Sequence, residues 1–391
     1  MLFTLCEEDH LSQNVDLGEK IDPLKVFRFT HIASYTRIKS SKPTIAVPGH
    51  PSLWSPLTEP KTLDRDRSEE DLPMEFGLEP LFRAVYMENR SFDMKAVSVL
   101  ADNRVLRILL DFASNNKHRK LHEAWTLEAE VLGSHTVAIR QIHSGDRAKT
   151  GNSAHRGMAF GRNFERANAK EMIEDGFQHQ RIITYQLGKL NVLTRYEADG
   201  FIDNDPSSRD KPTTPLRLGE ARTSSSGLQI LDHGQKVSPE SIIEIKTRGA
   251  SSGHQFGKVA AQLWFSRVTN LALATHQKGK FNPPKLRDVT GALKKWQNPN
   301  TENLNKLACG LDRLALVLRK VPKFKRVMMY FGLRSVTINS NEGKIDWMLP
   351  GDIYRMEWGE HPGDPESAHG NELFEQISSI EISYSKLFSL P

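Results

Sequence analysis

The fold is decided by the stretch SIIEIKTRGA, Ser241–Ala250. Its run of β-branched residues, followed by Thr and Gly, predicts a short buried strand. Side chains alternate along a strand, so Glu244 and Lys246 project from the same face of an otherwise apolar element. Buried charges are costly unless they pair or bind a metal. The strand therefore holds either a structural ion pair or an active site.

The same Glu-x-Lys spacing occurs at two other places, Glu59 to Lys61 and Glu342 to Lys344. Both copies sit in polar segments broken by Pro or Gly, which cannot be core strands. The spacing has the setting of a buried strand only at Glu244.

Composition describes an ordinary soluble chain of 391 residues, with 38% hydrophobic and 26% charged residues. No apolar run approaches the roughly 20 residues that span a bilayer, so no membrane partner is expected. The start, MLFTLCEEDHL, lacks the features of a secretory signal, which predicts a nuclear and/or cytoplasmic protein that is not secreted. Two cysteines cannot form a disulfide framework, and the net charge of +5 is compatible with a polyanionic partner.

The pattern of apolar residues divides the chain into a short N-terminal part and a much longer C-terminal part. Residues 1–77, rich in Pro, Ser and charge, are expected to form an extended N-terminal arm that packs on the core. Residues 78–391 are expected to form a single α/β domain with a long polar insertion at 204–240. The patterns predict helices at 96–114, 161–175, 255–277 and 303–318, a hairpin at 180–196, and strands at 124–142, 241–250, 327–332 and 335–338. This order predicts a mixed β-sheet flanked by helices.

Carboxylates gather on the elements around the Glu244 strand. Glu165 lies on the helix before the hairpin, and Glu197 and Asp199 follow at a spacing of two on its second strand. Gln262 lies on the helix that comes after the Glu244 strand. Converging carboxylates repel one another unless a divalent cation holds them, and hard oxygen ligands suit Mg²⁺ or Mn²⁺. Basic groups nearby would then suit a phosphodiester.

Two arginines, Arg156 and Arg162, flank the start of the Glu165 helix and are candidate phosphate contacts, although surface arginines are common. A basic cluster at 319–326 is a candidate nucleic-acid footprint, although charge runs are usually solvated surfaces.

The ordered motifs are GRNFE with Glu165, EAD with Glu197 and Asp199, EIKT with Glu244 and Lys246, and AQLWF with Gln262. In this order the chain resembles the PD-(D/E)xK nuclease superfamily, and within it the DXO-type RNA decapping exonuclease family. The resemblance covers about residues 155–275. It implies a PD-(D/E)xK nuclease-like core, with a helix before the hairpin and another after the Glu-x-Lys strand.

The resulting hypothesis is a Mg²⁺- or Mn²⁺-dependent hydrolase. Glu165, Asp199 and Glu244 would hold the metal with the main-chain carbonyl of Ile245, and Lys246 would orient water or stabilise developing charge. Glu197 and Gln262 would orient metal-bound waters or the substrate.

The resemblance implies that the substrate is the 5′ end of RNA, through removal of incomplete or non-standard caps, 5′-to-3′ degradation, or both. It also implies a possible 5′-to-3′ exonuclease partner protein. Two alternatives stay open from the residues alone: a DNA nuclease of the same superfamily, and a nucleic-acid-binding protein without turnover. Recognition of the 2′-OH separates RNA from DNA, and no residue pattern here reveals it.

Overall fold

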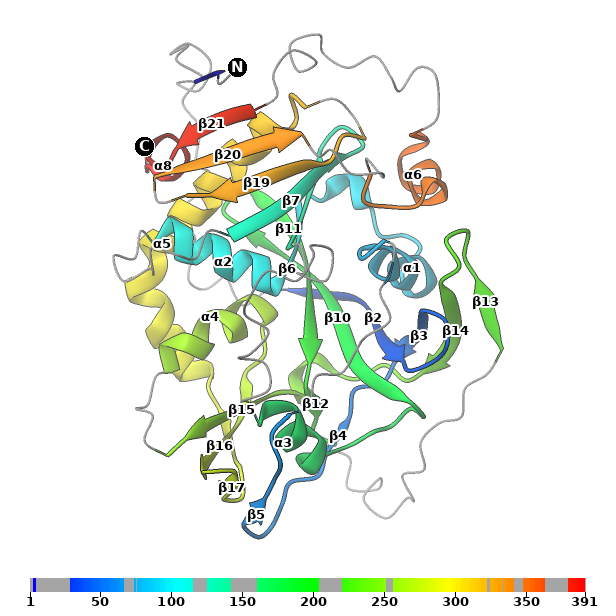
Figure 1. The fold of residues 1–391 in the computed structure, drawn as a ribbon, viewed down its shortest axis with the longest axis vertical. Coiled ribbons are helices and arrows are strands. Elements are labelled where there is room, and N and C mark those ends of the chain that lie inside the picture. The colour runs from blue at the N-terminus through cyan, green and yellow to red at the C-terminus, as the bar shows by residue number, and fades with distance from the viewer. Residues whose placement is uncertain are drawn as a thin grey trace.

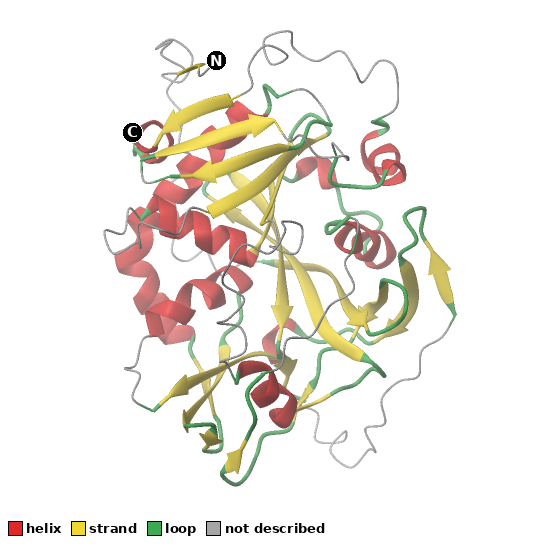
Figure 2. Ribbon diagram, in the orientation of Figure 1, coloured by secondary structure: helices red, strands yellow, loops and turns green. Residues whose placement is uncertain are grey.

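The computed structural model of the chain describes residues 3–4, 29–66, 74, 76–114, 125–141, 160–203, 220–250, 256–321, 324–332, 334–340, 347–362 and 379–390. Within these residues the strands form two sheets with helices on both sides (Figure 1, Figure 2). The α/β class with a mixed sheet flanked by helices, predicted from the sequence, is confirmed.

The larger sheet contains parallel and antiparallel neighbours, as in the parallel pair β11–β6 and the antiparallel pair β10–β11. From one edge to the other its strands are β1 (Phe3–Thr4), β21 (Ser379–Ser383), β20 (Ser335–Ser340), β19 (Val327–Phe331), β7 (Trp125–Leu132), β8 (Thr136–Gln141), β6 (Val99–Asp102), β11 (Leu190–Ala198), β10 (Gly176–Leu187), β2 (Thr30–Ile38), β3 (Thr44–Gly49), β14 (Gln229–Gly234) and β13 (Ala221–Thr223).

The smaller sheet holds the strand that the sequence singled out. Its order is β5 (Lys61–Thr62), β17 (Lys280–Phe281), β16 (Asn270–Gln277), β15 (Ile242–Gly249), β12 (Gly200–Phe201), β4 (Leu53–Trp54) and β9 (Ala169–Lys170), with β18 (Lys285–Asp288) also paired to β16. Strand β15 runs parallel to β16 and the helix between them makes the crossover that a parallel pair requires.

The helices are α1 (Glu79–Glu88), α2 (Asn103–Ala113), α3 (Gly161–Asn168), α4 (Phe256–Ser266), α5 (Thr290–Leu318), α6 (Gly351–Trp358) and α8 (Tyr384–Phe388). The 3-10 helices η1 (Met94–Ala96) and η4 (Pro239–Ser241) precede β6 and β15. Helices α2, α4 and α5 lie together on one side of the large sheet, and α1 and α6 lie on the other (Figure 1).

Alternation along the hairpin explains why both sides are covered. Ile183 and Val192 pack with α2, α4 and α5 in one core, whereas their neighbours Ile182 and Leu193 pack with α1 and α6 in a second core. All four side chains are fully buried. Strands apolar on both faces need a layer on each side, and the hairpin therefore forms the middle of the fold.

All four predicted helices have different bounds in the structure. The helix predicted at 161–175 ends at Asn168, which ties the chain to a neighbouring segment: its side-chain oxygen accepts from Leu57 N at 3.0 Å and its carbonyl accepts from Ser55 N at 2.9 Å. The helix predicted at 255–277 ends at Ser266, because Arg267 adopts a positive φ of 60° and residues 270–277 pair with β15 as β16.

The helix predicted at 96–114 begins at Asn103, since 99–102 pair as β6. The helix predicted at 303–318 begins earlier, at Thr290, and continues through Pro299. The predicted hairpin and the strands at 124–142, 241–250 and 327–338 are confirmed.

Residues 30–49 are more integrated than the predicted arm suggested, because β2 and β3 lie between β10 and β14 inside the large sheet. The division into an arm and a domain stays a prediction. In the insertion at 204–240, residues 204–219 lie outside the described residues. The remainder is not one polar loop, since β14 pairs with β3 and β13 extends the edge.

Among the helices of the described residues, none has both the length and the apolar character needed to cross a membrane.

Candidate active site

The predicted site lies where the chain passes from one sheet to the other. Strand β11 belongs to the large sheet and ends at Ala198, and two residues later Gly200 pairs with Ile243 of β15 in the small sheet. Glu197 is the next-to-last residue of β11, and Asp199 lies between β11 and β12. The passage between sheets therefore brings the carboxylates of the EAD motif to the strand that carries Glu244.

Asp199 fills a free position on the edge of β15. Strand β12 pairs with β15 only as far as Ile243, so the N–H of Ile245 needs another acceptor. The Asp199 carboxylate accepts this bond through Oδ2 at 2.7 Å. The bond fixes Asp199 against the main chain of the Glu-x-Lys motif.

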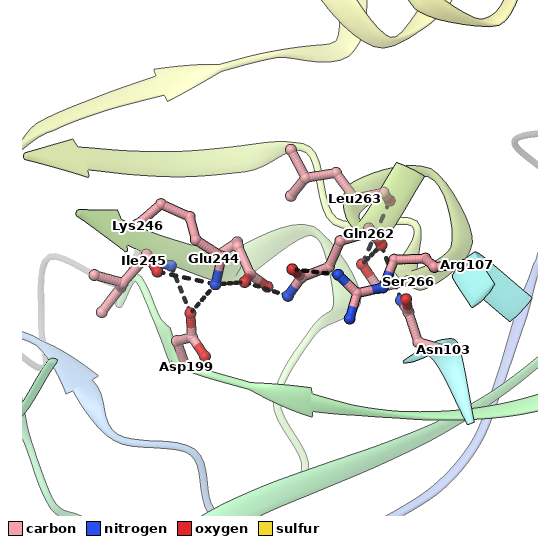
Figure 3. Close-up of polar contacts among 9 residues, drawn as sticks. All are labelled: Asn103, Arg107, Asp199, Glu244, Ile245, Lys246, Gln262, Leu263 and Ser266. Atoms are coloured by element: carbon pink, nitrogen blue, oxygen red, sulfur yellow. Dashed lines mark hydrogen bonds and ion pairs between the residues drawn. The ribbon is translucent and has the colours of Figure 1, made fainter. Parts of the chain in front are cut away.

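Glu244 and Lys246 form a direct ion pair on the same face of β15, as the alternation predicted (Figure 3). The Glu244 side chain is 1% exposed, whereas that of Lys246 is 29% exposed. The Lys246 ammonium also lies 3.7 Å from Asp199 Oδ2 and donates to the carbonyl of Ile245 at 3.2 Å. Lys246 thus contacts three oxygen-bearing groups of the predicted site.

Gln262 approaches Glu244 from helix α4 and donates to it through Nε2 (Figure 3). The orientation of this amide is set by Arg107 on α2, whose Nη1 donates to Gln262 Oε1 at 3.2 Å. A guanidinium can only donate, so the amide oxygen must face Arg107 and the amide nitrogen must face Glu244. Arg107 was not predicted from the sequence, where it was one charged residue on an amphipathic helix.

Helix α3 brings Glu165 to the same place. Phe164 is fully buried and packs with Ile243 and Ile245 of β15, which anchors the helix on the small sheet. The start of the helix is held by Asp66, which accepts from the N–H of Arg162 at 3.2 Å and of Asn163 at 2.9 Å. Asp66 therefore caps α3 from a distant segment, a contact that no local motif signals.

Burial and neighbouring charge raise the pKa of three of these carboxylates, those of Glu165, Glu197 and Glu244. Burial raises the pKa of Glu244 to about 8, and the charge of Asp199 adds to the rise. Burial beside Asp199 also raises the pKa of Glu165 well above its usual range. Burial raises the pKa of Glu197 to about 7, and the charge of Asp199 adds to the rise. Burial alone would lower the pKa of Lys246, but Glu244 and Asp199 outweigh it and raise it.

The donor set suits a hard divalent cation in its chemistry, since mutual repulsion of buried carboxylates is what such an ion relieves. As the side chains lie, however, no three His, Cys, Asp or Glu groups among the described residues are close enough to hold one ion. Lys246 contacts Glu244 and donates to the Ile245 carbonyl, two of the oxygen groups that the sequence assigned to the metal.

An open recess adjoins the cluster. Glu165, Glu197 and Asp199 form one wall, and Arg162 lies on the same recess. Arg162 is exposed and its charge acts on Glu197, so the structure brings this predicted phosphate contact close to the carboxylates. Arg156, the second predicted contact, lies outside the described residues.

Two histidines of the recess were not predicted as site residues, because they come from separate segments. His50 Nδ1 donates to the carbonyl of Pro51 at 2.8 Å, and His179 Nδ1 lies 2.9 Å from Thr36 Oγ1. Neither is part of a local pattern.

The basic cluster at 319–326 does not present a uniform charged surface. Arg319 donates to the carbonyl of His135 at 2.9 and 3.0 Å, and Arg326 lies 3.4 Å from the buried Glu128. These two arginines have structural partners, which weakens the nucleic-acid interpretation of the cluster.

The chain has an α/β fold similar to that of solved Rai1 structures. Rai1 of Candida albicans in complex with pU5 and Mn²⁺ matches with a TM-score of 0.57 and 13% identity, over 85% of this chain and 95% of that chain. Rai1 of Scheffersomyces stipitis in complex with 3′-NADP⁺ and calcium matches with a TM-score of 0.52 and 11% identity, over 88% and 98% of the two chains. Rai1 of S. pombe matches with a TM-score of 0.50 and 14% identity, over 80% and 93%.

At these identities the likeness establishes the fold, and the predicted similarity to DXO-type decapping enzymes is confirmed at that level. No curated protein matches the sequence significantly. The chain belongs to the family described as Domain of unknown function (DUF8563), which matches residues 25–358.

Proposed function

We propose that this protein is a divalent-cation-dependent phosphodiesterase that acts on the 5′ end of RNA. The observation that carries the proposal is the convergence of four acidic side chains and Lys246 at the crossing between the sheets, where burial and neighbouring charges raise the pKa of Glu165, Glu197 and Glu244. Fold likeness supports it, because solved Rai1 structures of this fold contain pU5 with Mn²⁺ in one case and calcium in another.

Glu165, Asp199 and Glu244 would hold the cation, with the Ile245 carbonyl as a further oxygen ligand. When bound, Mg²⁺ or Mn²⁺ lowers the pKa of coordinated water and neutralises charge on the phosphodiester. The neutralisation also offsets the repulsion that raises the pKa of Glu165 and Glu244. Among metals, these hard oxygen donors favour Mg²⁺ or Mn²⁺ over softer ions.

The protein's own groups have separate tasks. Once released from Glu244, the Lys246 ammonium is placed to stabilise negative charge that develops on a phosphate oxygen. Gln262, aligned by Arg107, keeps the Glu244 carboxylate in one orientation. Glu197 lines the recess and is placed to accept hydrogen bonds from water or substrate there.

The recess would receive the nucleotide at the end of the chain, with Arg162 near its phosphates. The lining of the recess also includes Phe177, His50 and His179. For such an end-specific site the resemblance suggests two activities, removal of incomplete caps and 5′-to-3′ degradation of RNA.

The test is hydrolysis of end-labelled RNA and DNA of one sequence, with 5′-monophosphate, 5′-triphosphate or capped ends, in Mg²⁺, Mn²⁺ or EDTA. We expect metal-dependent cleavage of RNA from the 5′ end, and loss of cleavage in Asp199→Asn, whose amide oxygen can still accept from Ile245 N. Asp232→Asn, on an exposed position of β14, is the matched control and should keep full activity.

Equal cleavage of DNA would favour the DNA nuclease alternative. Binding of RNA without cleavage under any metal condition would favour the non-catalytic protein, in which Lys246 serves as the permanent partner of Glu244 and Asp199. Activity of Asp199→Asn equal to that of the unaltered protein would place the chemistry elsewhere.

A further inference from the structure

Arg267 is a buried cation outside the candidate active site. It follows the last residue of α4, is 5% exposed and has a φ of 60°, a conformation that arginine rarely adopts. Its guanidinium carbon lies 4.2 Å from the ring centre of Tyr185 and 4.2 Å from that of Trp264. The guanidinium is therefore enclosed between two aromatic rings, one from β10 and one from α4.

The edge of this guanidinium has no hydrogen-bond acceptor in the part of the chain that the structure describes. Nε, Nη1 and Nη2 of Arg267 are all buried and unbonded among these residues. Stacking on aromatic faces stabilises a cation, but it leaves the N–H groups in the plane of the guanidinium unsatisfied. A buried charge normally has a partner of opposite sign.

Two more unbonded groups border the same rings. The amide of Gln297 on α5 accepts from Trp264 Nε1 at 3.1 Å through its oxygen, while its nitrogen is buried and, within the described residues, unbonded. The hydroxyl of Tyr185 is also buried and has no hydrogen-bond partner within the described residues. The indole of Trp264 stacks on Arg267 and donates to Gln297, so Arg267 and Gln297 both contact the same ring.

What these groups share is that each can donate. The guanidinium has five N–H bonds, the amide nitrogen has two, and the phenol has one. A water molecule would have to donate two hydrogens itself, and the unbonded groups here offer an acceptor only through the phenol. An anion needs donors alone and also neutralises the guanidinium. The enclosure of all three guanidinium nitrogens limits the size of the anion.

We propose that a small monovalent anion, chloride in solution, binds at the edge of Arg267 with Gln297 Nε2 and the Tyr185 hydroxyl as further donors. The site joins β10, α4 and α5, so the anion is a structural ligand that fastens these elements. It is separate from the proposed nuclease chemistry and does not depend on it.

The first experiment measures the melting temperature of the full chain at constant ionic strength while chloride replaces gluconate, which is too large for the site. Chloride at about 100 times its dissociation constant should raise the melting temperature by about 3 °C in a chain of this size. Arg319→Met, which removes an arginine bonded to a carbonyl, controls for general salt effects and should keep the chloride dependence.

Gln297→Glu is the sharpest variant. A carboxylate keeps the oxygen that Trp264 needs, removes the amide donor and supplies a negative charge next to Arg267. We expect this variant to fold, to melt in gluconate at or above the temperature of the unaltered protein in chloride, and to lose its chloride dependence. Arg267→Met should lose the dependence as well.

Crystals of the unaltered protein grown in bromide give an independent measurement, which stands even if Arg267→Met does not fold. An anomalous peak within hydrogen-bonding distance of the guanidinium supports the site. Equal melting temperatures in chloride and gluconate, chloride dependence retained in Gln297→Glu, or the absence of a bromide peak at Arg267 would each overturn the proposal.

Discussion

Replacement of Lys246 by Met separates a metal site from a structural ion pair. Met retains most of the length and the apolar stem of Lys but lacks the ammonium that contacts Glu244, so β15 should still pack. In metal-free buffer the 1%-exposed Glu244 then loses its cationic contact. The size of the resulting destabilisation depends on whether another cation can take the place of Lys246.

The loss has an upper limit that follows from protonation. A carboxyl with an ordinary pKa of about 4.3 can be neutralised at pH 7 for about 1.4 kcal/mol per pH unit over roughly 2.7 units, or about 3.7 kcal/mol. Because the pKa of Glu244 is raised to about 8 even beside Lys246, part of this cost is already present in the unaltered protein, and we expect a further loss of about 1–2 kcal/mol of unfolding free energy in EDTA. With Mg²⁺ or Mn²⁺ the loss should fall below about 0.5 kcal/mol.

Metal should restore the stability of Lys246→Met but not its activity. RNA hydrolysis by Lys246→Met should be about 100-fold slower even at saturating metal, the usual scale for loss of a group that stabilises transition-state charge. The assays are urea unfolding with and without metal, and product analysis of 5′-labelled RNA. Lys236→Met is the control, since Lys236 lies 3.1 Å from the buried Glu88 away from the site, and it should have normal activity and a metal-independent stability.

Two results would refute this reasoning. One is a loss of unfolding free energy in Lys246→Met that is the same with metal and with EDTA. The other is RNA hydrolysis within a few-fold of that of the unaltered protein. Either result would assign Lys246 to the structural ion pair that the sequence left open.

Three further predictions concern other residues. Arg107→Met should fold normally but lower kcat/KM about 10-fold, because the Gln262 amide is then free to flip, and unchanged kcat/KM would contradict this role. Arg195→Met removes two bonds to Asp102, at 2.8 and 3.0 Å, and should lower the urea-unfolding free energy by about 3 kcal/mol; a loss below about 1 kcal/mol would show that the pair is dispensable. Burial and nearby positive charge lower the pKa of His179. Below about pH 6.5 the unfolded chain therefore binds a proton that the folded chain does not. As the pH decreases below this value, the free energy of unfolding should decrease by about 1.4 kcal/mol per pH unit. His179→Gln should show a shallower fall between pH 6.5 and 5 in urea titrations, and an unchanged slope would exclude His179 as the cause.

Local pattern was sufficient for the strands and for the residue types of the site. The alternation in β15 predicted that Glu244 and Lys246 share a face, and the hairpin was readable from its two alternating runs. The order of the motifs then brought Glu165 into the same group, which the structure supports through the charges that act on it. These features depend on residues close in sequence or on motif order.

Helix ends and supporting contacts were not predictable, because they depend on distant segments. Asn168 ends α3 by bonding to residues more than 100 positions earlier, and Asp66 caps the start of that helix from a similar separation. Arg107 meets Gln262 across 155 positions. In β16 the repeated Leu and Ala suit a helix by propensity, and pairing with β15 decides the strand instead.

The interleaving of the two sheets has a consequence for how the protein is synthesised. Strands of the small sheet come from residues 53 to 288, and strands of the large sheet come from before, between and after them. Glu197 lies in the large sheet and Glu244 in the small sheet, so neither sheet alone assembles the acidic cluster. A ribosome must release β16 before β15 has its parallel neighbour, and long-range pairing of this kind is slow. The candidate active site should therefore be complete only late in synthesis, when the strands of both sheets have paired. A nascent chain that lacks part of either sheet around the site should be inactive.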